Sequence, residues 1–120
     1  NKKSAVHRFH EDYFEAYKKA AKEIEKALER AWGNEEEYQA AYLQQLVSGA
    51  LMAICNYYYR TSTFKRKERK LAVERICSDI ILREAIGKIG DINRQTRWII
   101  ENKSNLLILY AKMSNWKHGR

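Results

Sequence analysis

Two histidines and a glutamate near the start of the chain have a spacing that metal sites use. His7 and His10 stand three residues apart and Glu11 follows directly, so a helix beginning here would bring three ligand side chains to one end. A zinc site usually also needs a further ligand and a rigid second shell. We therefore expect an ordinary polar helix start here and no bound metal.

The two cysteines, Cys55 and Cys77, lie inside apolar patterns on different predicted helices. Neither has a Cys-x-x-Cys partner or a histidine close in sequence, which a nucleophilic or metal-binding cysteine would need. We expect both to be unpaired thiols of the core, as in a reducing compartment. A glycine-rich phosphate loop is also lacking, because Gly87 and Gly90 follow no strand. The sequence predicts no catalytic residue and no cofactor.

Positive charge is concentrated in the second half of the chain. Residues 1–59 carry eight Lys and Arg against nine Asp and Glu, whereas residues 60–120 carry fifteen against six. A run of cations occupies the N-terminal end of a predicted helix, where the helix dipole makes cations unfavourable. A departure from a local rule marks a candidate functional site, although a solvated face is the simpler explanation. The predicted membrane- or phosphate-binding basic strip consists of Arg60, Lys65, Arg66, Lys67, Arg69 and Lys70.

The C-terminal segment interleaves apolar and basic residues. We expect one long helix that starts at Asp91. Apolar residues repeat there at intervals of seven, at Ile92, Ile99, Leu106 and Met113. Trp98, Leu109 and Trp116 fall outside that stripe, among Lys and Arg residues. Because such a mixture suits the headgroup region of a membrane, we predict that these three side chains are interfacial anchors.

The elements that position these groups are predicted to be helices. The 120 residues include no proline and only five glycines, and helix-forming residues predominate. The stretch from Tyr38 to Tyr59 has no charged side chain in a chain that is 32% charged, so we expect a central buried helix. Its polar residues argue against a membrane span. Four of its residues are expected in the core: Leu46, Ala50, Ala53 and Ile54.

The flanking patterns predict a bundle around this central helix. A first amphipathic helix is expected from about His7, with its aromatic residues and Ile24 facing inward, and Gly33 and Asn34 would turn the chain back antiparallel. Hydroxyl residues 61–63 are expected to cap a third helix, and Ser78-Asp79 to be a cap or a break before a short fourth helix. The third helix is expected to carry Leu71, Ala72, Ile76, Cys77 and Ile80 inward. The predicted fold class is all-α, an antiparallel helical bundle of four to five helices.

The domain organisation is expected to be simple. Residues 1–120 form a single helical domain, with residues 1–6 as a frayed lead-in. Because the chain starts at Asn1 without an initiator Met, we expect it to be a C-terminal piece of a longer protein.

Several stretches resemble the helical C-terminal region of bacterial family 2 glycosyltransferases that build capsular and other cell-surface polysaccharides. The resembling stretches are Ser4-Ala5-Val6-His7, Tyr57-Tyr58-Tyr59-Arg60, Lys67-Glu68-Arg69-Lys70 and the helix from Leu106 to Trp116. The resemblance implies an upstream α/β catalytic domain that binds a nucleotide sugar through an aspartate-based metal motif. That motif is not part of these 120 residues, so this segment alone is expected to transfer no sugar.

Three hypotheses about function follow. In the first, the domain serves a glycosyltransferase as an accessory part: it braces the catalytic domain, forms homo-oligomers or docks on an anionic membrane surface. That hypothesis predicts a cytoplasmic protein at the inner face of the membrane. In the second, a small basic helical domain binds nucleic acid, but no helix-turn-helix spacing is evident. The third is a structural or partner-binding helical bundle.

Overall fold

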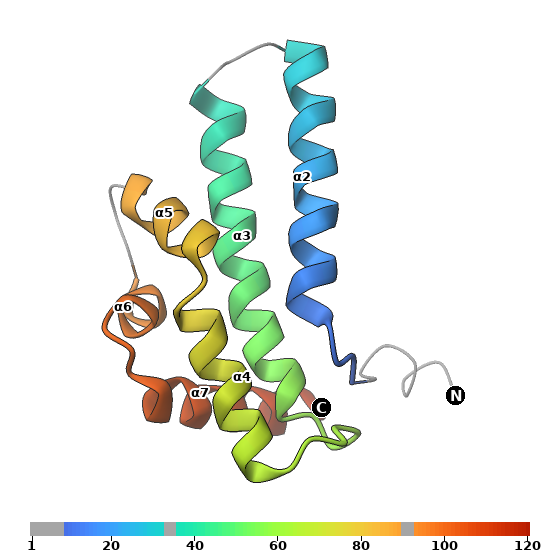
Figure 1. Ribbon diagram of the computed structural model, residues 1–120, viewed down its shortest axis with the longest axis vertical. Helices are drawn as coiled ribbons and strands as arrows, with labels where there is room; N and C mark the ends of the chain where they lie inside the picture. The colour runs from blue at the N-terminus through green and yellow to red at the C-terminus, as the bar shows by residue number, and fades with distance from the viewer. Residues whose placement is uncertain (1–8, 33–35, 90–92) are drawn as a thin grey trace.

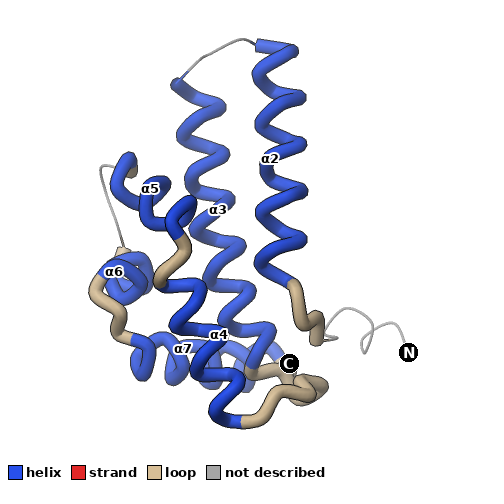
Figure 2. Tube along the Cα trace, viewed as in Figure 1, coloured by secondary structure: helices blue, strands red, loops and turns tan. Residues whose placement is uncertain are grey.

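The computed structural model describes residues 9–32, 36–89 and 93–120, and all regular structure in these ranges is helical (Figure 2). The helices are α2 (Tyr13–Trp32), α3 (Glu36–Tyr57), α4 (Arg66–Cys77), α5 (Ile80–Lys88), α6 (Arg94–Ile100) and α7 (Ser104–His118). The all-α prediction is confirmed, while the described ranges hold six helices where four to five were expected. Within these ranges, no helix combines the length and the apolar character that a membrane crossing requires.

The helix α3 is central, as predicted. It runs antiparallel beside α2 and also contacts α4, α5 and α7, and α7 crosses the lower end of the molecule (Figure 1). The upper ends of α2 and α3 extend beyond the other helices. There the described side chains, residues 22–31 and 39–45, include no buried one. The core therefore lies around the lower half of the α2–α3 pair.

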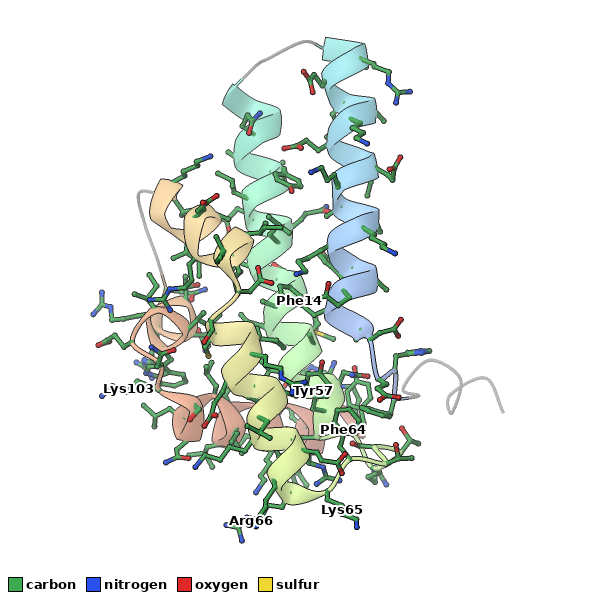
Figure 3. The ribbon with its side chains drawn as sticks, viewed as in Figure 1. Phe14, Tyr57, Phe64, Lys65, Arg66 and Lys103 are labelled. Carbon is green, nitrogen blue, oxygen red and sulfur yellow. The ribbon has the colours of Figure 1, made fainter. Side chains whose placement is uncertain are left out.

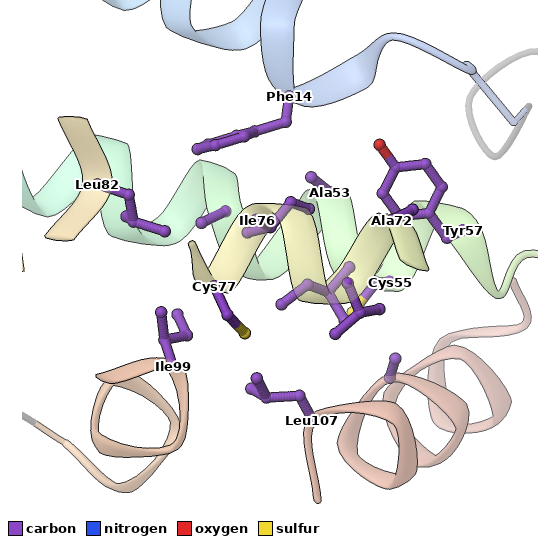
Figure 4. Close-up of a cluster of buried hydrophobic side chains, with 14 of the residues drawn as sticks. Phe14, Ala53, Cys55, Tyr57, Ala72, Ile76, Cys77, Leu82, Ile99 and Leu107 are labelled. Atoms are coloured by element: carbon purple, nitrogen blue, oxygen red, sulfur yellow. The ribbon is translucent and has the colours of Figure 1, made fainter. Parts of the chain in front are cut away.

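The predicted core residues of α3 are confirmed. Leu46, Ala50, Ala53 and Ile54 are all buried. Figure 4 shows how the other elements close around Ala53, with Phe14 from α2 on one side and Ile99 and Leu107 from α6 and α7 on the other. The uncharged stretch is therefore surrounded on several sides from Leu46 onward, whereas the prediction of burial fails for residues 39–45.

The start of α2 differs from the prediction. The helix begins at Tyr13 rather than near His7, because the buried side chain of Asn56 holds His10 outside it. Asn56 Nδ2 donates to the His10 carbonyl oxygen at 2.7 Å, and its Oδ1 accepts from the His10 N–H at 2.9 Å. The buried face of α2 is also rotated: Phe14 and Ala21 are buried, whereas Ile24 is exposed.

The predicted long C-terminal helix is wrong. It is broken between α6 and α7 at Asn102, which has a φ of 55° in the left-handed region that asparagine tolerates better than most residues. The N–H groups of Asn102 and Lys103 donate to the carbonyl oxygens of Ile99 and Trp98, the pattern that closes a helix C-terminus. Because α7 starts afresh, the repeat of seven is lost, and Leu106 and Met113 are exposed.

Two capping predictions had different outcomes. Asp79 is the N-cap of α5 and accepts from the Leu82 N–H, as expected. The N-cap of α4 is Lys65, not a hydroxyl residue, and its N–H donates to Glu68 Oε1 at 2.9 Å.

Of the residues expected to face inward on the third helix, Leu71 and Ile80 are exposed, while Ala72, Ile76 and Cys77 are buried. The predictions for residues 1–8, Gly33, Asn34, Gly90, Asp91 and Ile92 lie outside the described residues.

Two glycines offer a matched test of the α2–α3 packing. A Cβ at Gly49 would overlap the ring of Tyr17, whereas a Cβ at Gly87 in α5 would meet no atom within 4 Å. Alanine is favoured over glycine inside a helix by roughly 1 kcal/mol, so Gly87→Ala should stabilise the domain by up to that amount. Gly49→Ala should instead destabilise it by about 1–2 kcal/mol, because overpacking exceeds the helix gain. Urea unfolding measures both, and equal effects of the two changes would contradict the close packing of α2 on α3.

Candidate functional site

The described part of the chain offers no thiol or metal chemistry. Cys55 and Cys77 are free and buried, as predicted. Burial raises the pKa of both thiols, that of Cys77 to about 11, so both are protonated at neutral pH and are poor nucleophiles. No group of three or more His, Cys, Asp or Glu side chains in the described ranges is placed to hold a metal ion.

An acidic pocket of about 300 Å³ lies between the start of α2 and α4. Its aromatic lining includes Phe14, Tyr57 and Phe64 (Figure 3), and the last two rings are stacked at 5.6 Å. Lys18 Nζ already binds Asp79 Oδ2 at 2.6 Å and Glu15 Oε1 at 3.1 Å. Burial alone would lower the pKa of Lys18, but these hydrogen bonds raise the pKa above its usual value. Lys18 therefore neutralises two of the four acids of the pocket, and Arg75 also lines it, so we interpret the pocket as a packing seam between helices.

The structure divides the predicted basic strip into three parts. Lys65, Arg66, Lys67 and Lys70 are exposed at the N-terminal end of α4, and the first two point away from the ribbon (Figure 3). Arg60 lies apart in the loop after α3, where its Nη2 donates to the Gly119 carbonyl oxygen at 2.9 Å.

The remaining residue of the strip, Arg69, turns towards α7. Its guanidinium lies 5.5 Å from the ring of Tyr58, and Lys112 Nζ from α7 lies 5.8 Å from the same ring. Burial raises the pKa of the Tyr58 hydroxyl, and the nearby guanidinium groups of Arg69 and Arg66 act in the opposite direction. Tyr58 is therefore the point at which cations of α4 and α7 meet.

Beside Tyr58 the chain forms a pocket of about 520 Å³, which we call the basic pocket. Three cations line it and no Asp or Glu side chain does. None of the three forms an ion pair with a carboxylate side chain among the described residues. The lining consists of Tyr58, Arg60, Lys112, Asn115, Trp116 and Arg120.

The basic pocket was not predicted as a unit: Arg60 was predicted to bind phosphate or membrane, whereas Lys112, Asn115 and Arg120 were not predicted as site residues. A signal was present in the spacing. Lys112 lies three residues after Leu109 and four before Trp116, so it is their neighbour on a helix surface. The contact with Tyr58, which lies 54 residues earlier in the sequence, had no such signal.

The predicted anchors are brought together. Trp98, Leu109 and Trp116 all line an open groove of about 640 Å³ between α6 and α7, which we call the apolar groove. Leu109 is 54% exposed, Met113 63% and Trp116 87%. The cationic rim is formed by Arg94 and Lys117. The apolar lining consists of Trp98, Leu106, Leu109, Tyr110, Met113 and Trp116.

The basic pocket and the apolar groove are adjacent because Trp116 lines both. Residues 93–120, which form most of this surface, carry six Lys and Arg but a single acidic residue, Glu101. This face therefore combines exposed apolar side chains with cations that form no ion pair among the described residues.

The chain matches no protein-family model, and no curated protein or solved structure is significantly similar to it. The resemblance to glycosyltransferase C-terminal regions therefore stays a prediction, and function has to be argued from this surface.

Proposed function

We propose that this helical domain docks on an anionic membrane surface through the face formed by α6 and α7. The observation that carries the proposal is the apolar groove itself, in which exposed Leu109, Met113 and Trp116 are flanked by cations with almost no acidic residue nearby. A purely solvated face would not need large exposed apolar groups, and a core face would not need the cations.

The physical basis is the match between this face and a lipid headgroup layer. Amphipathic rings such as the indole of Trp116 are favoured at the membrane–water boundary, and neighbouring aliphatic side chains reach the first acyl carbons. Each Lys or Arg near an anionic leaflet contributes about 1 kcal/mol. The exposed cations at the start of α4 add to the attraction at longer range. The domain would then lie on the membrane and not span it.

The same proposal includes a longer protein, a glycosyltransferase of which this domain would be the C-terminal part. The resemblance to family 2 glycosyltransferases supports a role in which docking holds an upstream catalytic domain at the inner face of the membrane, near a lipid-linked acceptor. Bracing that catalytic domain and forming homo-oligomers are alternative uses of the same exposed face, which the test below separates.

The test is co-sedimentation with vesicles of phosphatidylcholine alone or mixed with phosphatidylglycerol. Wild-type protein should bind the anionic vesicles, and more weakly as salt increases. Changing Leu109, Met113 and Trp116 together to Gln should lower the affinity at least tenfold, because about 1.4 kcal/mol of lost apolar contact suffices for that. The matched control changes three exposed apolar residues elsewhere, Leu71, Ile80 and Ile81, to Gln and should bind as wild type does.

Other outcomes would identify a different partner. Equal loss in the two triple variants would contradict docking through the α6–α7 face. Tighter binding to duplex DNA than to vesicles at the same ionic strength would favour a nucleic-acid-binding domain. If the wild-type protein dimerises but binds no vesicles, and the Leu109, Met113 and Trp116 variant does not dimerise, this face is an oligomer interface.

A further inference from the structure

We infer that the basic pocket is a headgroup site for one lipid phosphomonoester, whose acyl chains lie in the adjoining apolar groove. This inference rests on the proposed function, because the lipid must come from the surface on which the domain docks. The proposed function requires only a general attraction to an anionic membrane. This inference adds a specific ligand, a lipid with a single phosphate group and two hydrophobic chains.

The first observation is the concentration of positive charge without a carboxylate partner. Arg60, Lys112 and Arg120 line the pocket, and Arg69 lies against its Tyr58 wall. A guanidinium has five N–H donors, and among the described residues one nitrogen of Arg60 binds Gly119 and one of Arg120 binds Ser114 Oγ. Donors therefore remain for the oxygens of an anion, which guanidinium groups bind in charge-assisted pairs.

The second observation is the location of incomplete hydrogen bonding. Three buried side-chain polar atoms lack a partner in the described ranges: Arg69 Nε, Asn115 Oδ1 and Arg120 Nε. Asn115 and Arg120 line the basic pocket, and Arg69 packs on Tyr58, which also lines it. Asn115 is 5% exposed and uses its Nδ2 to bind the Cys55 carbonyl oxygen at 2.9 Å. Buried polar atoms without partners are rare, and here two guanidinium donors, Arg69 Nε and Arg120 Nε, occur where the cations cluster. Asn115 Oδ1 is an acceptor, so it would pair with the hydroxyl of a singly protonated phosphomonoester and not with a charged oxygen.

The third observation is the shared wall. Trp116 lines both the basic pocket and the apolar groove. A molecule with a phosphate at one end and acyl chains at the other would fit across this wall, with its charge beside Lys112 and its chains against Leu109 and Met113. A soluble phosphate would use only the basic pocket and leave the exposed apolar residues in water.

The chemistry of the pocket favours a phosphomonoester over a diester. A phosphomonoester carries between one and two negative charges at neutral pH and presents three oxygens, whereas a diester headgroup such as phosphatidylglycerol carries one charge and a bulky substituent. Several cations directed at one small pocket complement the more compact and more highly charged group.

The experiment compares vesicles containing phosphatidic acid with vesicles containing phosphatidylglycerol, adjusted to the same zeta potential. Wild-type protein should bind phosphatidic acid about tenfold more tightly, the effect of roughly one additional charge-assisted hydrogen bond. Lys112→Met should abolish this preference while retaining binding to phosphatidylglycerol. The matched control Lys70→Met removes one exposed cation outside the pocket and should weaken binding to both lipids equally. Circular dichroism melting of both variants verifies that they are folded.

A soluble arm identifies the source of the phosphate. Dihexanoyl phosphatidic acid below its micelle concentration should bind at least tenfold more tightly than glycerol 3-phosphate, because only the former has chains for the groove. Equal affinities of the two would overturn the lipid assignment in favour of a soluble phosphate. Equal binding of phosphatidic acid and phosphatidylglycerol, or a preference that survives in Lys112→Met, would overturn the headgroup site alone. Failure to bind any anionic vesicle would overturn the proposed function itself.

Discussion

Leu46→Asp should leave most of the protein unfolded at room temperature. Leu46 is 1% exposed and packs with Ala21 and Ala85, so it joins α2, α3 and α5. The change removes about 2 kcal/mol of apolar burial and places a carboxylate among apolar neighbours, which costs several kcal/mol more. A domain of ordinary stability has only about 5–15 kcal/mol in total. Circular dichroism during heating and urea titration would measure the loss.

The matched control for this change is Gln45→Asp. Gln45 is the preceding residue on α3 and is exposed, so it receives the same charge on the same helix without burial. Its effect should stay within about 0.5 kcal/mol of wild type. A Leu46→Asp protein that melts at the wild-type temperature would show that the central helix is not packed as described.

Asn56→Ala should cost about 2–4 kcal/mol and release the segment before α2. The buried amide makes two hydrogen bonds to the backbone of His10, and each unpaired group left behind costs about 1–3 kcal/mol, less where water reaches it. Phe9 precedes His10 and would lose part of its support, while the packing of its ring on Phe64 at 5.0 Å and the hydrogen bond from its N–H to Thr61 Oγ1 would remain. Urea unfolding gives the cost, and faster proteolysis near residues 9–12 reports the release.

Asn105→Ala provides the comparison, because Asn105 is an exposed asparagine near the start of α7. It should change stability by less than about 0.5 kcal/mol. If both substitutions had equal effects, the two hydrogen bonds to His10 would not contribute to stability in solution.

The sequence was most informative where the pattern lay within one continuous stretch of the chain. The absence of charge from Tyr38 to Tyr59 identifies the central helix whatever surrounds it, and its core residues were predicted correctly. The anchors Trp98, Leu109 and Trp116 could be recognised as outside the apolar stripe. That they share one groove could not be predicted, because this depends on the break at Asn102, and asparagine is tolerated both inside a helix and at its left-handed end.

The contacts that could not be predicted join residues far apart in the sequence. Asn56 reaches His10 across 46 residues, and its pairing sets where α2 begins. Lys112 and Arg69 come from different helices to the same tyrosine. Spacing along one helix indicates which side chains share a face, but the neighbours supplied by another helix depend on packing angles that no local pattern encodes.

The projecting ends of α2 and α3 imply that stability is graded along this helix pair. Beyond Ala21 in α2 and before Leu46 in α3, no described side chain is buried, although Tyr42 and Leu43 still pack against the cluster formed by Ala21, Leu46 and Ala85. The backbone hydrogen bonds of the projecting ends can open without disturbing the core around Ala50 and Ile54. Amide hydrogens near Glu25 or Ala40 are then expected to exchange through small local openings, while those near Ala53 exchange only on global unfolding. The hairpin would then combine a stable lower half with an upper half that opens more readily.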